Sequence, residues 1–185
     1  AGGGGFPMHA HRDMEILTYI IEGALEHRDS MGNAGVIQSG EIQQMSAGTG
    51  VRHSEFNASG DTPVHLLQIW IVPDKMGYQP KYDQKDFSER LANSEFVLLA
   101  SRSGREGSAV IHQDVDLFAV RSAATGQKTH ALGAGRGLWL QVIRGDVTGA
   151  GIVLSAGDGL GLADIASVDS SWSAGAEFLI FDLAV

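Results

Sequence analysis

Short apolar segments separated by glycine-containing turns fill the first part of the chain. The segment at 15–21 is apolar and rich in β-branched residues, and it ends at the turn dipeptide Glu22-Gly23. Short strands spaced about 8–12 residues apart and joined by such turns are typical of β-sandwiches and small barrels. We therefore predict strands at residues 15–21, 24–29, 35–38, 42–45, 51–57 and 64–72.

A polar segment interrupts this pattern in the middle of the chain. Residues 73–90 are rich in Lys, Asp and Gln, and we predict a surface connection there, with one short helix at 86–93. The strand pattern then resumes at 96–100, 110–113 and 117–121.

The second half of the chain echoes the first. Residues 19–26 align with 141–148, and the Gly-acidic turn at 39–41 aligns with 156–158. An internal repeat of this kind implies two similar structural units. We therefore predict an all-β chain of two antiparallel β-barrels.

Composition narrows the possible classes of protein. Glycine supplies 25 of the 185 residues, about twice its usual share, which suits many tight turns. The net charge is −9 without a compensating Lys/Arg cluster, which opposes binding to DNA or RNA. The absence of cysteine excludes disulfides and thiolate metal sites. The apolar runs are too short to span a membrane, and the start of the chain lacks a signal-peptide pattern, so we expect a cytoplasmic protein.

Two pairs of metal-binding residue types stand at strand spacing. In the H-x-H sequence of His9 and His11, the alternation of side chains along a strand puts both imidazoles on one face, roughly 7 Å apart. His53 and Glu55 repeat that spacing further along the chain. Three imidazoles and one carboxylate suit a divalent transition metal and leave positions open for a substrate or O₂. Neighbouring strands in matching register would bring the four residues together.

The remaining histidines are isolated in the sequence. His27, His65, His112 and His130 each stand alone in a strand that is otherwise apolar or polar. We expect ordinary structural roles for these four residues.

The same residues resemble the two conserved motifs of the cupins. The first motif contains the H-x-H sequence and Glu15, and the second runs from Gly40 through Gly48 to His53 and Asn57. More narrowly, the segments FPMHAHRDMEILTYIIEGALEHRDSMGN, GEIQQMSAGTGVRHSEFN and HLLQIWIVP closely resemble the pirin family of bicupins. This resemblance covers residues 5–73, and the rest of the chain is compatible with the C-terminal half of a pirin.

The pirin resemblance implies a bicupin fold of two stacked antiparallel β-barrels of the jelly-roll (double-stranded β-helix) type. We expect residues 1–90 to form the metal-binding barrel and residues 91–185 a structural barrel. Pirins carry further strands before the H-x-H motif, whereas this chain begins eight residues before His9. We therefore expect the N-terminal barrel to be incomplete.

The resemblance also implies the ligands, namely His9, His11, His53 and Glu55. A generic cupin would use Glu15 as its carboxylate ligand, whereas pirins use the glutamate two residues after the histidine of the second motif, which is Glu55 here. We therefore expect Glu15 to orient a ligand histidine rather than to bind the metal. Extending the repeat alignment places Ala131, Gly133, Ser170 and Trp172 at the positions of the four ligands. Because these residues cannot form the ligand set, we expect one ion per chain.

The activity that the resemblance implies is quercetinase-type dioxygenation, in which O₂ cleaves the central ring of a flavonol and carbon monoxide is released. Glu55 is the predicted general base. We expect Fe²⁺ as the cofactor, with Mn²⁺, Ni²⁺, Co²⁺, Cu²⁺ and Zn²⁺ as alternatives because the ligand set suits all of them. The expected partners are a flavonol and O₂, and the expected state is a monomer.

Two other functions remain open from the sequence. The first is a non-enzymatic, redox-sensing co-regulator of transcription, which would bind a protein partner through a metal-dependent surface. The second is another cupin reaction, such as isomerisation or hydrolysis with a different metal. Turnover of a flavonol distinguishes the dioxygenase from both.

Overall fold

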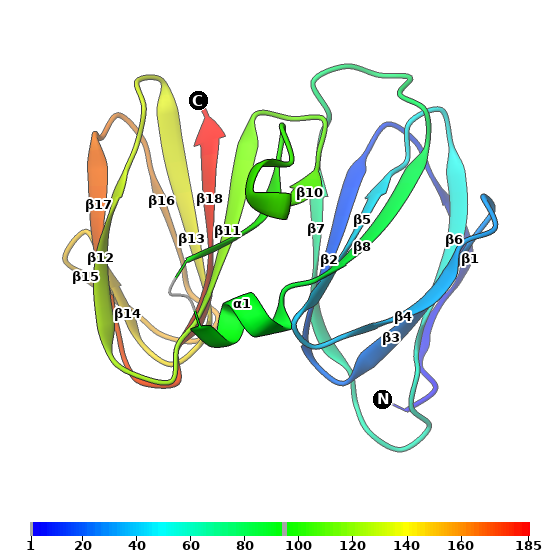
Figure 1. Ribbon diagram of the computed structural model, residues 1–185, viewed down its shortest axis with the longest axis horizontal. Coiled ribbons are helices and arrows are strands. Elements are labelled where there is room, and N and C mark those ends of the chain that lie inside the picture. Colours follow the sequence, from blue (N-terminus) through cyan, green and yellow to red (C-terminus); the bar gives the residue numbers. More distant parts are fainter. Residues whose placement is uncertain (1, 94–95) are drawn as a thin grey trace. The chain divides into compact units, whose positions relative to one another are not determined.

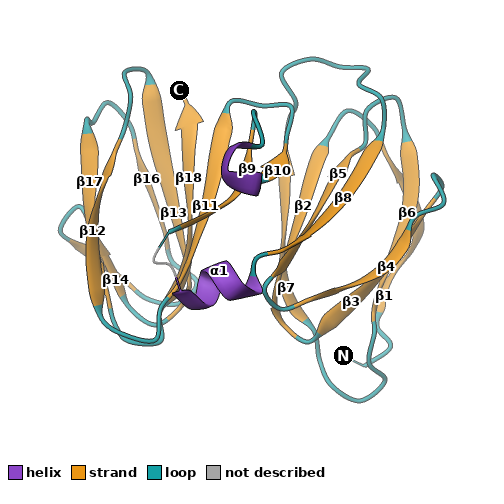
Figure 2. Ribbon diagram, in the orientation of Figure 1, coloured by secondary structure: helices purple, strands orange, loops and turns teal. Residues whose placement is uncertain are grey.

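The computed structural model describes residues 2–93 and 96–185, which form mainly antiparallel strands (Figure 1, Figure 2). The chain divides into two compact units: Ala1–Ser88 with Ala109–Gln113 form unit 1, and Glu89–Ser108 with Asp114–Val185 form unit 2. In the described ranges, helical structure is limited to α1 (Ser88–Asn93) and the 3₁₀ turn η1 (Arg105–Gly107). None of the helices in these ranges is long and apolar enough to cross a membrane. The prediction of an all-β chain is confirmed.

Unit 1 contains two four-stranded sheets. Its strands are β1 (Gly5–His11), β2 (Glu15–Glu22), β3 (Ala24–Asp29), β4 (Ala34–Gln38), β5 (Glu41–Ser46), β6 (Val51–Asn57), β7 (His65–Ile71) and β8 (Lys81–Asp86). One sheet has the order β1-β6-β3-β4, and the other has the order β7-β2-β5-β8. The short strand β10 (Ala109–Val110) also belongs to this unit.

Strand β8 lies where the sequence predicts a surface connection, and that prediction is wrong. The segment pairs antiparallel with β5, from Glu41 opposite Asp86 to Ser46 opposite Lys81. It forms the edge of its sheet. Because edge strands often carry charged side chains, which discourage pairing with other chains, the apolar alternation that marks the inner strands is missing here.

A row of polar side chains crosses the middle of the second sheet of unit 1. Thr18 on β2 lies opposite Gln43 on β5 and Gln68 on β7. Apolar residues flank this row on the same face of β2, with Ile16 in one buried cluster and Ile20 in another. The interior of unit 1 is therefore polar at this level and apolar on either side of it.

Unit 2 repeats the two-sheet organisation around an apolar interior. Its strands are β9 (Val97–Ser101), β11 (Val115–Arg121), β12 (Gly126–Ala131), β13 (Arg136–Arg144), β14 (Val147–Gly149), β15 (Ile152–Leu154), β16 (Gly159–Leu162), β17 (Ser167–Trp172) and β18 (Glu177–Ala184). One sheet has the order β12-β17-β14-β15, and in the other β9, β11, β18, β13 and β16 follow one another. Trp172, Phe178 and Ile180 belong to its main buried cluster.

The strand orders of the two units correspond, but the predicted alignment of the ligand positions is partly wrong. In unit 1, β1 pairs with β6 so that His9 lies opposite His53. In unit 2, β12 pairs with β17 so that Lys128 lies opposite Ser170, and His130 lies two residues further along. The counterparts of the H-x-H pair are thus Lys128 and His130. The predicted alignment, which has no gaps, is therefore displaced by three residues in this segment, and the turn after β12, which is one residue longer than the turn after β1, accounts for one of them.

The turn before β6 depends on a glycine at position 48. Gly48 has a φ of +45°, and a Cβ there would lie 2.0 Å from the carbonyl oxygen of Tyr78. We expect Gly48→Ala to lower the free energy of unfolding by more than the roughly 1–2 kcal/mol that a left-handed backbone alone costs. Gly77→Ala is the matched control, because Gly77 also has a positive φ but has open space around it. Equal urea midpoints for the two variants would contradict this account.

Candidate metal centre

Three neighbouring strands of unit 1 bring the predicted site residues together. Strand β6 lies between β1 and β3. His53 on β6 stands opposite His9 on one side and Asp29 on the other. Glu55, two residues along the same strand, stands opposite His27 on β3. The pairing of β1 with β6, which the sequence leaves open, therefore exists in the register that the site requires.

The three predicted histidine ligands form one cluster. One ligand atom from each of His9, His11 and His53 lies within 4.8 Å of the others. The ring centroids are 4.4 Å apart for His9 and His53, and 4.9 Å apart for His11 and His53. The Nδ1–H of His9 donates to the carbonyl oxygen of Pro7 at 2.8 Å, which leaves the lone pair of His9 on Nε2.

Glu55 belongs to a second cluster, which the sequence analysis missed. One ligand atom from each of His27, His53 and Glu55 lies within 4.8 Å of the others, and all three side chains are buried. His27, for which we expected an ordinary structural role, thus lies beside two of the predicted ligands. The sequence does carry a signal, because the alternation along 24–29 puts His27 on the same inward face as Leu25.

Gln68 holds one oxygen of the Glu55 carboxylate and leaves the other without a partner. The side-chain amide of Gln68 donates to Glu55 Oε2 at 2.7 Å, and the Oε1 atom of Glu55 has no hydrogen-bond partner. Gln68 in turn accepts a hydrogen bond from Trp70 Nε1 at 3.1 Å, and the Trp70 ring packs edge-on against His11. This chain of contacts fixes the orientation of Glu55 relative to the three-histidine cluster.

Burial controls the protonation of the site. Desolvation, followed by the nearby rings of His9, His27 and His11, lowers the pKa of His53 from 6.5 to about 3. Desolvation and the neighbouring His9 also lower the pKa of His11. Desolvation raises the pKa of Glu55. At neutral pH His11 and His53 are therefore uncharged and have lone pairs available for a metal.

The lowered pKa of His53 predicts that the metal-free protein loses stability in mild acid. Between pH 6.5 and about 3 the unfolded chain binds a proton on His53 that the folded chain does not bind. The free energy of unfolding therefore falls as the pH falls through this window. We expect the urea midpoint to drop between pH 7 and pH 4, and to drop less in His53→Asn. An identical pH dependence in that variant would contradict the assignment.

Glu15 does not orient a ligand histidine, so that prediction is wrong. Within the described residues, its buried carboxylate accepts hydrogen bonds from Gln44 Nε2 at 2.9 Å and Ser46 Oγ at 2.8 Å. The Nδ1–H of His112 also donates to it, at 2.9 Å. The alternation that predicts Glu15 near the H-x-H pair fails because Glu15 begins β2, which lies in the other sheet.

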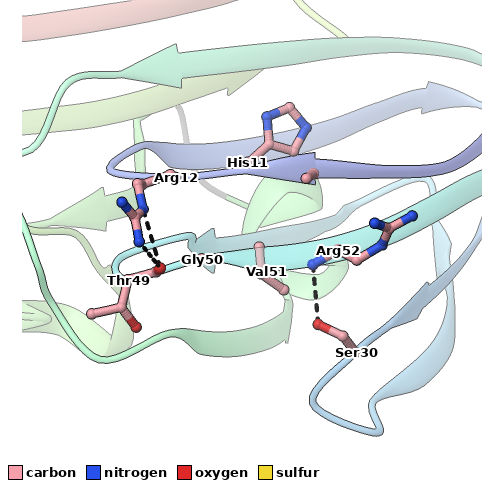
Figure 3. A pocket seen from close by; sticks show the side chains of 8 residues that line it. His11, Arg12, Ser30, Thr49, Gly50, Val51 and Arg52 are labelled. Atoms are coloured by element: carbon pink, nitrogen blue, oxygen red, sulfur yellow. Dashed lines mark hydrogen bonds between the residues drawn. The ribbon is translucent and has the colours of Figure 1, made fainter.

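A hollow of about 380 Å³ opens beside His11 (Figure 3). The side chains of Arg12 and Arg52 line it together with His11. The guanidinium of Arg12 donates to the carbonyl oxygen of Thr49 at 3.0 Å and 3.2 Å. His11 is the one member of the three-histidine cluster that lines this hollow.

The residues of the site fit a metal ion. The Nε2 atom of His11, both ring nitrogens of His53 and the Oε1 atom of Glu55 are buried and have no hydrogen-bond partner. Buried polar atoms normally have a partner, so such a concentration of unpartnered atoms needs an explanation. Imidazole nitrogens with a carboxylate oxygen are a ligand set that divalent transition metals accept.

A chain with two jelly-roll units has the fold of a bicupin. The cluster of histidines inside the first unit is the kind of site that binds a metal ion. The chain matches the Pirin family over residues 2–71 and the quercetinase C-terminal cupin domain over residues 98–183. It is 44% identical to a quercetin 2,3-dioxygenase of Escherichia coli strain K12, over 98% of this chain and 77% of the relative. The chain therefore belongs to the pirin family, as its sequence motifs predict.

Solved structures and further relatives agree with this assignment. The bacterial pirin YhhW of Escherichia coli in complex with nickel(II) matches with a TM-score of 0.92 and 43% identity, over 99% of this chain and 78% of that one. A pirin-like protein of Caulobacter vibrioides is 38% identical over 97% of this chain and 78% of the relative. The predicted bicupin fold is confirmed, although hydrogen bonding divides each unit into separate sheets rather than one closed barrel.

Proposed function

We propose that this chain is a metal-dependent dioxygenase that cleaves flavonols such as quercetin with O₂ and releases carbon monoxide. The observation that carries the proposal is the buried set of unpartnered ligand atoms on His11, His53 and Glu55. It occurs in a chain that is 44% identical to a quercetin 2,3-dioxygenase. The proposed enzyme acts as a monomer in the cytoplasm.

His9, His11, His53 and Glu55 would hold the ion. We propose Fe²⁺ as the resident metal, with another divalent ion as the alternative, since the YhhW relative was solved in complex with nickel(II). When bound, a divalent ion supplies Lewis acidity that lowers the pKa of a coordinated hydroxyl group.

Glu55 is the proposed general base. Burial raises its pKa, which makes its carboxylate a better proton acceptor than an exposed glutamate. Gln68 holds Oε2 and leaves Oε1 without a protein partner, so Oε1 would be available to a flavonol hydroxyl once Glu55 is released from the ion. Transfer of that proton leaves an electron-rich flavonolate, which is the form that reacts with O₂.

Carbon monoxide release tests the proposal. The metal-loaded chain is incubated with quercetin under O₂, and both the loss of quercetin and the carbon monoxide in the headspace are measured. We expect the two to match in amount. If a panel of flavonols gives no carbon monoxide at full metal occupancy, the dioxygenase proposal is wrong and a metal-dependent protein-binding role is favoured.

A further inference from the structure

The side chain of His27 is held as a metal ligand would be held. Its Nε2–H donates to Asp29 Oδ2 at 3.3 Å, and its ring stacks on Tyr82 with a centroid distance of 4.8 Å. A carboxylate that accepts from one ring nitrogen fixes the tautomer and the ring orientation of a ligand histidine. The lone pair of His27 is therefore on Nδ1, which is buried and has no hydrogen-bond partner.

Asp29 is itself anchored, so that it can fix His27. The backbone N–H groups of Met31 and Asn33 donate to Asp29 Oδ1 at 2.9 Å and 3.0 Å. The Asn33 side chain donates to Oδ2 at 2.8 Å. Burial opposes ionisation of Asp29, but these hydrogen bonds outweigh it and lower its pKa. An ionised, rigid Asp29 keeps the proton of His27 on Nε2.

The atoms that face one another around His27 are electron-pair donors. The unpartnered atoms are Nδ1 of His27, the ring nitrogens of His53 and Oε1 of Glu55. One ligand atom from each of these three residues lies within 4.8 Å of the others. Neutral His53 has a hydrogen on one ring nitrogen and a lone pair on the other, so each of the three residues can offer one lone pair. A cation between them would give these buried, unpartnered atoms a partner.

We propose that His27, His53 and Glu55 form a second, inner ion position that binds a divalent transition metal without His9 and His11. This inner position shares His53 with the three-histidine cluster, and two divalent cations so close together repel each other. One ion therefore occupies one position at a time. The inference rests on the proposed function and deepens it, because the inner ion would engage two of the four residues assigned there, His53 and Glu55, without His9 and His11.

Cobalt(II) binding to the double variant H9A/H11A tests the inner position. We expect this variant to bind one Co²⁺ per chain. Binding is measured by calorimetry and by the visible absorption of the ion. Adding His27→Ala should weaken Co²⁺ binding by more than about 100-fold, because it removes a ligand of the inner position. Adding His65→Ala instead is the matched control, because His65 is exposed on β7, and it should change nothing. Failure of H9A/H11A to bind Co²⁺, or equal affinities with and without His27, would overturn the proposal.

Anomalous diffraction from the Co²⁺-loaded double variant gives a second test that does not require a change at His27. The expected peak lies within bonding distance of His27 Nδ1 and Glu55 Oε1, and a peak elsewhere contradicts the inner position. Neither measurement uses a flavonol. Absence of quercetin cleavage would therefore count against the proposed function alone, and absence of Co²⁺ in H9A/H11A against the inner position alone.

Discussion

The Glu55→Gln variant is expected to keep bound metal and to lose quercetin cleavage by a factor of about 10²–10⁴, the usual contribution of a general base. Glutamine has nearly the same shape and still offers a carbonyl oxygen, but it cannot accept a proton at neutral pH. Metal content by elemental analysis and carbon monoxide release from quercetin are measured on the same preparation.

Glu26→Gln is the matched control for this variant. Glu26 lies on β3 in the same unit, and its partner is the exposed Arg28, so both metal content and turnover should stay unchanged. Carbon monoxide release by Glu55→Gln at the rate of the parent chain would show that Glu55 is not the base.

His53→Ala is expected to have the largest effect on metal binding. His53 is the residue common to both clusters of ligand atoms, so its loss removes a ligand from each. Loss of a residue that hydrogen-bonds to a metal ligand typically lowers the metal affinity by about 10–100-fold. Loss of the ligand itself should lower it by more than about 100-fold. Competition with a coloured chelator measures the affinity.

The control for this measurement is again His65→Ala, which removes an exposed histidine of the same unit. His11→Ala should have a smaller effect than His53→Ala, because His11 belongs to only one of the two clusters. Equal affinities in the parent chain and His53→Ala would contradict the assigned ligands.

The shared face of each ligand pair could be predicted from the sequence because it depends on local alternation. His9 and His11 share a face of β1, and His53 and Glu55 share a face of β6, as a period of two requires. Most of the strands of unit 1 could be predicted for the same reason. The sequence could not establish that β1 and β6 are neighbours, because pairing depends on the path of the whole chain.

The second cluster of ligand atoms was not predicted from the sequence. His27 reaches Glu55 only because β3 pairs with the other edge of β6, and its neighbour Tyr82 comes from β8, whose polar sequence resembles a loop. The prediction that Glu15 orients a ligand histidine was wrong for the opposite reason. It is near the H-x-H pair in sequence, but it belongs to the opposite sheet and contacts His112 instead.

The most direct test of the account is the transition-metal content of the chain purified without added metal. The unpartnered nitrogens of His11 and His53 and the free oxygen of Glu55 predict about one divalent transition-metal ion per chain, most of it lost in His53→Ala. A parent chain that is fully folded and contains no transition metal would contradict the central claim.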